Sequence, residues 1–485
     1  MLRRFIDRQL RDFNEDALIR IFKIFAAAAG VVLAYAFVFS GFQIVDEFEH
    51  LHASWLVSTG KVPYKDFFEH HNPLLWYVSA PLVNAFYDKA IIFYVMRGVS
   101  ALVSLITLFF IYKTALLFAS RAGAWLAVAL TLGNLITLYN FYQFRPDNFM
   151  NLGFVVGIYY WFCYLKNPQR KLLVISFLAF TLSALFLQKI SLLLIVVEAF
   201  IIGLIACKRM PLKEAVWAAV PAIGTIGIFI LFLYTNGILE DYFIFNLNFN
   251  QAMVAYFDRG AFWYGNLFIS FYGAALLIGL YLFKQQNIFY KLLFGLYAAE
   301  FLMRAYYFAP HPNYYTLLTM LAALVSAPVL DKVFPRYKIF MPVLLILMFI
   351  HLGLLFNRID ATSAKHNSFE HYKLADYVHK NSRPDDYLMN GYDKNFNIYR
   401  RDVSYYWFGL DMLLPIMEAE YKIKNKPDVN AYILQYKPKF IYVKNYPDLR
   451  AYRTYGESRY TQIFMPELIQ EFYQKTPFEY LAVLK

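Results

Sequence analysis

Long apolar runs separated by short polar connections constrain this sequence more than any other feature. A helix needs roughly 20 apolar residues to cross about 30 Å of hydrocarbon. The chain is 60% hydrophobic and 16% charged, whereas soluble domains are about half apolar and about a quarter charged. We therefore predict a polytopic α-helical membrane protein with about 11–13 transmembrane helices. The expected spans are 22–42, 91–118, 122–140, 148–165, 171–188, 190–207, 214–235, 263–283, 289–308, 314–330 and 338–356.

The charges of the connections predict how these spans are oriented. Alternate connections read KNPQRK, CKRMPLK, KQQNIFYK and DKVFPRYK, and the basic N-terminal stretch lies on the same side. Lys and Arg gather in cytoplasmic loops, so we assign these segments to the cytoplasm. The same loops explain much of the net charge of +12, and we predict no nucleic-acid partner. The N-terminal stretch is expected to stay attached, because no small-residue cleavage site follows the first apolar run.

The composition changes near residue 357. The segment HYKLADYVHKNSRPDDYLMNGYDKN has the pattern of a helix, a Pro-Asp turn and a short strand, and KPKFIYVKN has that of another strand. We predict a transmembrane domain over 1–356, with a first outer loop at 43–90. A small extracytoplasmic α/β domain is expected over 357–485.

The stretch IVDEFEHLHA places Asp46 and Glu47 directly after the first apolar run. In a helix, His50 follows these carboxylates by four and three residues, so the three side chains share a face. A carboxylate beside an apolar wall has a raised proton affinity that an imidazole can offset, which suits a general base. The spacing fits a solvated helix with incidental charges equally well.

The stretch GKVPYKDFFEHHNPLLWY presents polar side chains just before the apolar segment 73–86, which is too short to span. His71 and Asn72 are candidates for substrate binding. Glu69, His70 and His71 could ligate a metal, but adjacent histidines point apart on a helix and no HExxH spacing is present. We expect no metal and no cofactor, with a divalent cation as the less favoured alternative.

Further ionisable groups occur at the outer ends of the expected spans. Such groups are functional candidates because charge at membrane depth is costly, although each alone could be a snorkelling side chain. Arg and Lys donate strongly to anionic oxygens, so phosphate recognition is their natural use. We expect phosphate binding by Arg145, Lys189 and Arg304, and substrate contacts from Asp147, His311 and Tyr315. No Gly-rich phosphate loop or nucleophile elbow occurs, which favours a lipid phosphate over a nucleotide.

Three motifs together resemble the GT-C membrane glycosyltransferases, in particular the protein O-mannosyltransferase and lipid A aminoarabinose transferase branches. They read VDEFEHLHASWLVSTGKVPYKDFFEHHNPLLWY, MRGVSAL and RPDNF. The hydropathy layout and the polar C-terminal region match as well, so the resemblance covers the whole chain.

The resemblance implies an inverting transfer of a sugar from a polyprenyl (undecaprenyl-type) phosphate to a hydroxyl on a glycan, lipid or protein. Asp46 matches the catalytic carboxylate of the family's motif and would accept the proton of the acceptor, while Glu47 would orient the base or the acceptor. The compact layout fits the bacterial inner membrane, with the active site and the C-terminal domain facing the periplasm. HHNPLL stands where aminoarabinose transferases have Lys-Pro, which argues against an aminoarabinose donor and a lipid A acceptor.

Two other functions fit a polytopic protein. A flippase or transporter of lipid-linked sugars should carry charges through the middle of its spans, whereas most charges here lie near their ends, with Arg97 an exception. An assembly subunit that docks through its C-terminal domain would leave the cluster around Asp46 without a purpose. The glycosyltransferase is therefore the favoured hypothesis.

Overall fold

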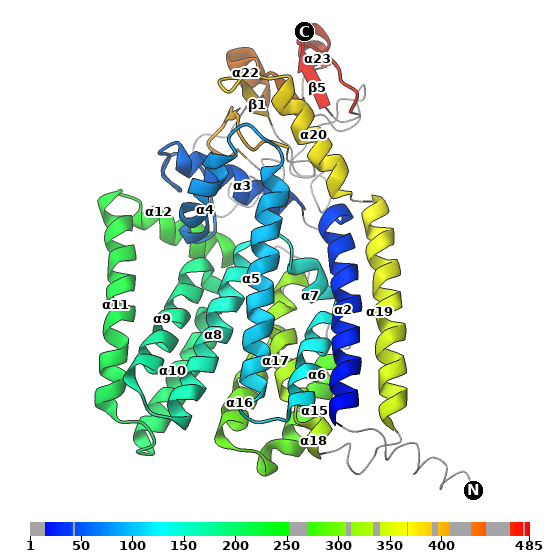
Figure 1. Ribbon diagram of the computed structural model, residues 1–485. Coiled ribbons are helices and arrows are strands. Elements are labelled where there is room, and N and C mark those ends of the chain that lie inside the picture. Colours follow the sequence, from blue (N-terminus) through cyan, green and yellow to red (C-terminus); the bar gives the residue numbers. More distant parts are fainter. Residues whose placement is uncertain are drawn as a thin grey trace, which may run out of the picture. The chain divides into compact units, whose positions relative to one another are not determined.

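We analysed a computed structural model of the protein (Figure 1). The residues that it describes are 15–41, 44–251, 270–306, 312–332, 340–365, 367–389, 396–407, 428–442, 466–478 and 481–485. They divide into two compact units, and each is described by itself. The first unit comprises the described residues of Met1–Ser40, Gly98–Phe229 and Asp258–Lys365, and the second those of Gly41–Arg97, Ile230–Phe257 and His366–Lys485.

The first unit consists of helices. Its elements are α2 (Glu15–Phe39), most of α5 (Ile92–Ala115), α6 (Arg121–Leu132), α7 (Leu135–Asn140), α8 (Pro146–Lys166), α9 (Arg170–Phe186), η1 (Gln188–Ile190), α10 (Ser191–Ala206), most of α11 (Leu212–Thr235), α15 (Phe271–Leu282), η3 (Phe283–Gln285), α16 (Ile288–Tyr306), η4 (Pro312–Tyr315), α17 (Thr316–Ser326), α18 (Val329–Lys332) and α19 (Phe340–Lys365).

Six helical segments within the described residues are long and apolar enough to cross a membrane. They are Glu15–Phe39, Ile92–Ala115, Gln188–Ala206, Leu212–Thr235, Asn313–Lys332 and Pro342–Ala364. The other expected spans coincide with helices that are shorter or less apolar, such as α6 and α8, and part of the expected span 263–283 lies outside the described residues. The prediction of a polytopic helical membrane protein is confirmed.

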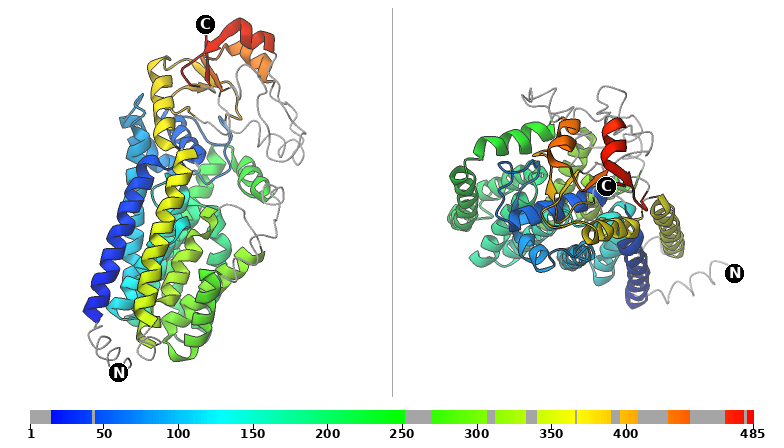
Figure 2. Two further views of the ribbon diagram at one scale, coloured as in Figure 1. Left: turned by 90° about the vertical axis from the view of Figure 1, so that its right-hand side faces the viewer. Right: turned by 90° about the horizontal axis from the view of Figure 1, so that it is seen from above.

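The burial pattern of α2 shows that one face of this helix packs against protein and that its other faces suit contact with lipid. Its buried residues recur every three or four positions, as one helical face requires. On other faces Ile24 and Val31 are 61% and 71% exposed, which is favourable only where lipid takes the place of water. The buried face packs against α6 and α19, and α2 and α19 run side by side in both views (Figures 1 and 2).

Small residues bring α8 and α9 close together. Gly153 and Gly157 are spaced as in the small-xxx-small motif of membrane helix pairs. A Cβ at Gly153 would lie 2.9 Å from the carbonyl oxygen of Ala179, so only glycine fits there. The hydroxyls of Ser176 and Ser183 donate across the interface to carbonyls of α8. This packing supports the end of α8 where Arg145 and Asp147 lie.

The second unit contains helices and a five-stranded sheet. Its helices are α3 (Ile44–Ser58), α4 (Leu74–Ala85), α12 (Leu239–Phe243), η2 (Ile244–Phe249), α20 (Ser368–Lys380), α22 (Val429–Tyr436) and α23 (Pro466–Phe472). Its strands are β1 (Tyr387–Met389), β2 (Arg401–Asp402), β3 (Phe440–Tyr442), β4 (Tyr473–Lys475) and β5 (Leu481–Leu484).

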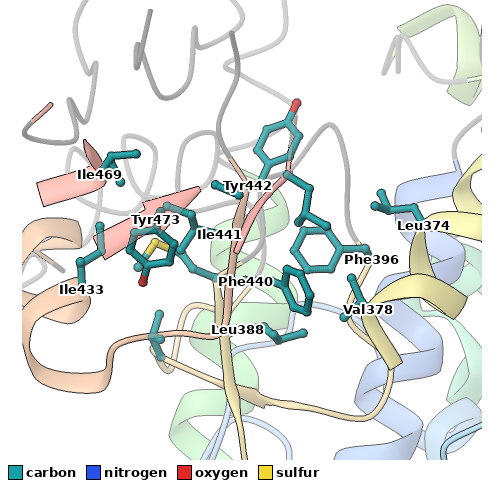
Figure 3. Packing of buried hydrophobic residues seen from close by; sticks show 14 residues of the cluster. Leu374, Val378, Leu388, Phe396, Ile433, Phe440, Ile441, Tyr442, Ile469 and Tyr473 are labelled. Atoms are coloured by element: carbon teal, nitrogen blue, oxygen red, sulfur yellow. The ribbon is translucent and has the colours of Figure 1, made fainter. Parts of the chain in front are cut away.

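The strand order is β2-β1-β3-β5-β4, with β1 parallel to β2 and β3, and β5 antiparallel to β3 and β4. The predicted helix, turn, strand and second strand correspond to α20, β1 and β3, so the α/β character of the C-terminal region is confirmed. Side chains of α20 and of the sheet form one apolar core, in which Val378 and Leu388 lie beside Phe440 (Figure 3).

Residues of the expected outer loop and of the expected C-terminal domain belong to the same unit. The Nε1 of Trp407 donates to the carbonyl oxygen of Phe68 at 3.2 Å. Tyr399 donates to the carbonyl oxygen of Val83 at 2.9 Å. The helix α19 runs through Lys365, past the expected start of the C-terminal domain at residue 357.

His379 makes the stability of the second unit sensitive to acid. Burial, together with the positive charge of Arg400, lowers the pKa of His379 to about 3. The unfolded chain, with an ordinary histidine pKa near 6.5, binds this proton more readily, so stability is lost as the pH falls below that value. Each pH unit between about 6.5 and 3 lowers the free energy of unfolding by about 1.4 kcal/mol.

We expect His379→Gln to remove about 2 kcal/mol of the stability loss between pH 6.5 and 5. Thermal unfolding in detergent across this range measures the slope for wild type and variant. Other titrating groups contribute equally to both proteins and cancel in the difference. Equal slopes would show that His379 is accessible to protons in the folded chain.

Candidate functional site

The two adjacent carboxylates at the start of α3 have different surroundings. Glu47 is fully buried, whereas Asp46 is half-buried in the first turn of α3. Arg97, also fully buried, donates to both carboxylate oxygens of Glu47, from Nε at 2.9 Å and from Nη2 at 2.5 Å. The guanidinium carbon of Arg97 lies 4.3 Å from the ring centroid of Phe93. Glu47 thus ties α3 to the start of α5.

Four potential ligand groups meet beside α3. Single ligand atoms of Glu49, Glu69, His70 and His71 all lie within 4.8 Å of one another. Nδ1 of His71 is 3.3 Å from a carboxylate oxygen of Glu49 and 3.7 Å from one of Glu69. The His50 ring lies 5.1 Å from the His71 ring, and its Nδ1 accepts a hydrogen bond from Trp76. We call the first four residues the Glu/His cluster.

The Glu/His cluster perturbs the pKa of its members. Burial and the negative charge of Glu49 raise the pKa of Glu69 well above its usual range. Burial lowers the pKa of His71, but the neighbouring carboxylates of Glu49 and Glu69 outweigh it and raise the pKa to about 9. Burial and the neighbouring His71 and His50 lower the pKa of His70, which is therefore neutral at pH 7.

The loop that carries Glu69, His70 and His71 is held from several sides. Tyr64, which adopts a φ of 67°, donates to the carbonyl oxygen of His71. Asn250 donates to the carbonyl oxygen of His70 at 2.7 Å. Asn72 is buried, and its side-chain oxygen accepts from Tyr242 at 2.9 Å. The contacts of Asn250 and Tyr242 join this loop to a segment 180 and 170 residues away in the sequence.

The helix α3 also contacts the C-terminal region. Nε2 of His52 lies 2.5 Å from a carboxylate oxygen of Asp402, and its Nδ1 lies 3.0 Å from the carbonyl oxygen of Ile398. The buried Arg400 donates to Asp88 at 2.5 Å. The segment 396–407 therefore fixes α3 and the end of the first outer loop.

A second polar group lies in the first unit. Asp147, in the first turn of α8, accepts from Arg145 at 3.3 Å and also from Lys189. Nζ of Lys189 lies 4.4 Å, and the guanidinium of Arg304 5.7 Å, from the ring centroid of Tyr314. We call Arg145, Lys189 and Arg304 the cationic group.

The cationic group carries an excess of positive charge. Besides Asp147, its carboxylate partner is Glu300, which accepts from Arg304 at 2.7 Å. Within the part of the chain that the structure describes, three cations thus face two carboxylates, and Arg145 and Glu300 are both buried. An anionic oxygen would complete the charge balance.

The structure places some of the predicted site residues close to one another. Asp46, His50 and His71 lie on or beside α3, and Arg145 and Lys189 both contact Asp147. Tyr315 is buried, with its ring 6.3 Å from that of Tyr272, and His311 lies outside the described residues. These positions leave their predicted roles as proposals.

Sequence reasoning missed two members of this arrangement. Glu49 was not singled out, although it follows Asp46 by three residues, a spacing that shares a helix face. Arg97 was noted as a charge inside a span, but its partner Glu47 was not identified. A buried arginine requires a carboxylate, so pairing Arg97 with the nearest outer-face acid was available from the sequence.

Comparison with solved structures identifies the fold of this chain, whereas comparison with known sequences does not. No protein-family model and no curated protein sequence matches this chain. Two solved structures of ArnT from Cupriavidus metallidurans are similar, one in the apo state and one bound to undecaprenyl phosphate. They match with TM-scores of 0.57 and 0.56 at 14% and 13% identity, covering 88% of this chain and 92% and 93% of theirs.

The chain has the GT-C fold. ArnT, an aminoarabinose transferase, is itself a GT-C glycosyltransferase, so the resemblance found in the sequence is confirmed at the level of the fold. At this identity, the roles of individual residues require their own tests.

The buried ion pair gives a test of how α3 is held. We expect Glu47→Gln to destabilise the protein by about 3–5 kcal/mol, because it leaves Arg97 buried without a counter-charge. Replacing both residues, as Glu47→Gln with Arg97→Met, should recover part of this loss. Thermal unfolding of the two single variants and the double variant measures the coupling. Additive effects would show that the pair does not hold α3.

Proposed function

We propose that this protein is an inverting glycosyltransferase that moves a sugar from a polyprenyl phosphate to a hydroxyl acceptor, with Asp46 as general base. The proposal rests on the different surroundings of the two adjacent carboxylates at the start of α3. Glu47 is buried in an ion pair with Arg97, whereas the neighbouring Asp46 is half-buried. The GT-C fold, shared with an ArnT that binds undecaprenyl phosphate, supports the class of donor.

In the proposed reaction, the acceptor hydroxyl attacks the anomeric carbon from the side opposite the lipid phosphate. A bond forms between the acceptor oxygen and this carbon as the bond from the carbon to the phosphate oxygen breaks. The hydroxyl proton passes to the carboxylate of Asp46, and the electron pair leaves with the polyprenyl phosphate. A positioned base of this kind contributes typically 10²–10⁴-fold to the rate.

The cationic group is the proposed site for the donor phosphate. Phosphate oxygens accept strong hydrogen bonds from Arg and Lys, and such donors stabilise the charge that develops on a leaving group. Lys189 and Arg304 both lie beside Tyr314, and Arg145 lies one residue before α8. His50, His71, Asn72, Asp147, His311 and Tyr315 stay the proposed contacts to sugar and acceptor.

We place the reaction at the outer face of a bacterial inner membrane. The Lys- and Arg-rich connections assign the opposite face to the cytoplasm, which puts α3 and the C-terminal region in the periplasm. A polyprenyl phosphate presents its sugar close to the lipid surface, and Asp46 follows the first span by only a few residues. The acceptor is a glycan, a lipid or a protein.

We expect Asp46→Asn to lower the rate of sugar transfer by 10²–10⁴-fold, because the amide cannot accept the proton. The measurement uses purified protein and a panel of radiolabelled polyprenyl-phosphate sugars, with donor hydrolysis as a second readout. Asp66→Asn, which changes an outer-loop carboxylate bonded to the amide of Val62, is the matched control and should keep its activity. Full activity of Asp46→Asn would refute the assignment of the base. Movement of the lipid-linked sugar across vesicles without transfer would instead support the flippase.

For the phosphate site, we expect Lys189→Gln to weaken binding of undecaprenyl phosphate by at least tenfold, because it removes a charge-assisted hydrogen bond. Inhibition of transfer by added undecaprenyl phosphate measures this affinity. Lys208→Gln, at an exposed position between α10 and α11, is the control for loss of one positive charge. Equal inhibition of all three proteins would remove Lys189 from the phosphate site.

A further inference from the structure

We propose that the outward face of α10 binds the same face of a second copy of this chain within the membrane. The proposal goes beyond the proposed glycosyltransferase activity and does not depend on it. It rests on a carboxyl group in the middle of a membrane span, Glu198, and on the residues that surround it on the helix. Neither feature takes part in the sites described above.

Glu198 faces outward near the middle of a membrane span. The span Gln188–Ala206 consists of η1 and α10, and at 1.5 Å per residue Glu198 lies about 12–15 Å from either end. Glu198 is exposed, and its side chain has no hydrogen bond or ion pair among the residues that the structure describes. Ionisable residues in membrane helices almost always face protein and a polar partner. Glu198 therefore indicates a partner that the described part of one chain does not supply.

The exposed residues around Glu198 recur in adjacent pairs every four positions along α10 and the residue that follows it. The pairs are Glu198 with Ala199, Ile202 with Gly203, and Ala206 with Cys207. We call these six residues the α10 outer face. Residues four apart share one side of a helix, and small residues at this spacing let two membrane helices approach closely. The α10 outer face thus has the pattern of a helix-pairing surface with a carboxyl group beside it.

Gly203 does not serve packing within the described part of the chain. A Cβ at Gly203 would meet no atom within 4 Å, whereas a Cβ at Gly295 of α16 would lie 2.6 Å from the ring of Phe200. Gly295 thus lets α16 approach α10 closely, and no such neighbour accounts for Gly203. Glycine weakens a helix, so its presence is favourable where another backbone must come near. A second helix on the α10 outer face would be that neighbour.

The α10 outer face is self-complementary, which identifies the partner as a second copy of this chain. Copies of one chain share their orientation in a membrane, so a twofold axis along the membrane normal would set two α10 helices parallel and bring identical residues together. A carboxylic acid can both donate and accept a hydrogen bond, so two Glu198 side chains can satisfy each other in hydrocarbon. Ala199 and Gly203 would let the backbones come close enough for this contact.

Cysteine cross-linking in native membranes tests this interface. Cys207 is exposed and follows Gly203 by one helical turn, so the dimer would bring two copies of Cys207 close together. Two differently tagged copies of the full-length protein are co-expressed, each with Cys163→Ser so that Cys207 is the only cysteine. After treatment with a short bismaleimide, we expect a cross-linked dimer that contains both tags. The same protein with Cys207→Ser should give no such product.

Variants locate the interface on α10. Gly203→Leu should lower the yield of cross-linked dimer by about fivefold or more, because the larger side chain separates the helices. Gly224→Leu on α11, where a Cβ likewise meets no atom within 4 Å, is the matched control and should keep the yield. Glu198→Leu should also weaken the dimer, whereas Glu198→Gln, which still donates and accepts, should retain it.

Three results would overturn the proposal. The first is the absence of any cross-link between the two tagged copies, a result that does not depend on how the α10 variants fold. The second is a yield of dimer that neither Gly203→Leu nor Glu198→Leu changes, because the contact would then lie elsewhere. The third is a cross-link of Cys207 only to a different protein, because the partner would not be a second copy. Sugar transfer is not measured, so failure of the proposed function would be seen separately.

Discussion

The ion pair between Glu47 and Arg97 fixes the orientation of α3, and the proposed role of Asp46 depends on that orientation. Each residue of an α-helix is rotated by about 100° from the one before it. Once Glu47 points to Arg97, Asp46, Glu49 and His50 fall within an arc of about 100° that begins about 60° away from Glu47. A buried charge pair with two hydrogen bonds holds this rotation more firmly than apolar packing alone would, because slipping by one residue would leave Arg97 unpaired.

Aromatic side chains and backbone carbonyls complete this support. The loop before α4 carries no regular hydrogen-bond ladder, so its carbonyl groups must find other donors. Tyr64, Asn250 and Trp407 supply them to His71, His70 and Phe68. Each donor comes from a different part of the chain, and the rings of Tyr64 and Trp407 each bring apolar contact area together with one polar atom. The C-terminal segment is thus part of the scaffold of the outer loop.

Local patterns in the sequence account for much of the fold. Hydropathy located the helices because a membrane allows few alternatives to an apolar helix. The helix, turn and strands after residue 367 followed from their periodicity and from the Pro-Asp turn. Motif comparison proposed Asp46 as the base, and charge proposed Arg145 and Lys189 as phosphate ligands; both roles stay predictions, and the structure shows that Arg145 and Lys189 contact Asp147.

The pairings between distant residues could not be predicted in the same way. His52 and Asp402 are separated by 350 residues, and Glu47 and Arg97 by 50. Such contacts depend on how helices and loops pack, which no local period encodes. The sequence named Glu69, His70 and His71 as possible ligands but set them aside, since their loop was judged by the geometry of a helix, and it did not single out Glu49. Pro73, which directly precedes the first helical residue of α4, keeps His70 and His71 out of that helix.

The contacts of Asp147 explain how the cations of the proposed phosphate site can be held at the end of a membrane helix before a phosphate binds. A lysine and an arginine beside each other repel, and isolating either from water is costly. Asp147 offsets both costs in the absence of substrate, because it accepts from Lys189 and Arg145 together. In the proposed reaction a phosphate would replace part of this interaction, so the cations exchange one anionic oxygen for another and are not left unpaired. Under the proposal, such an exchange would bind the phosphate with moderate strength, which release of the polyprenyl phosphate after each transfer would require.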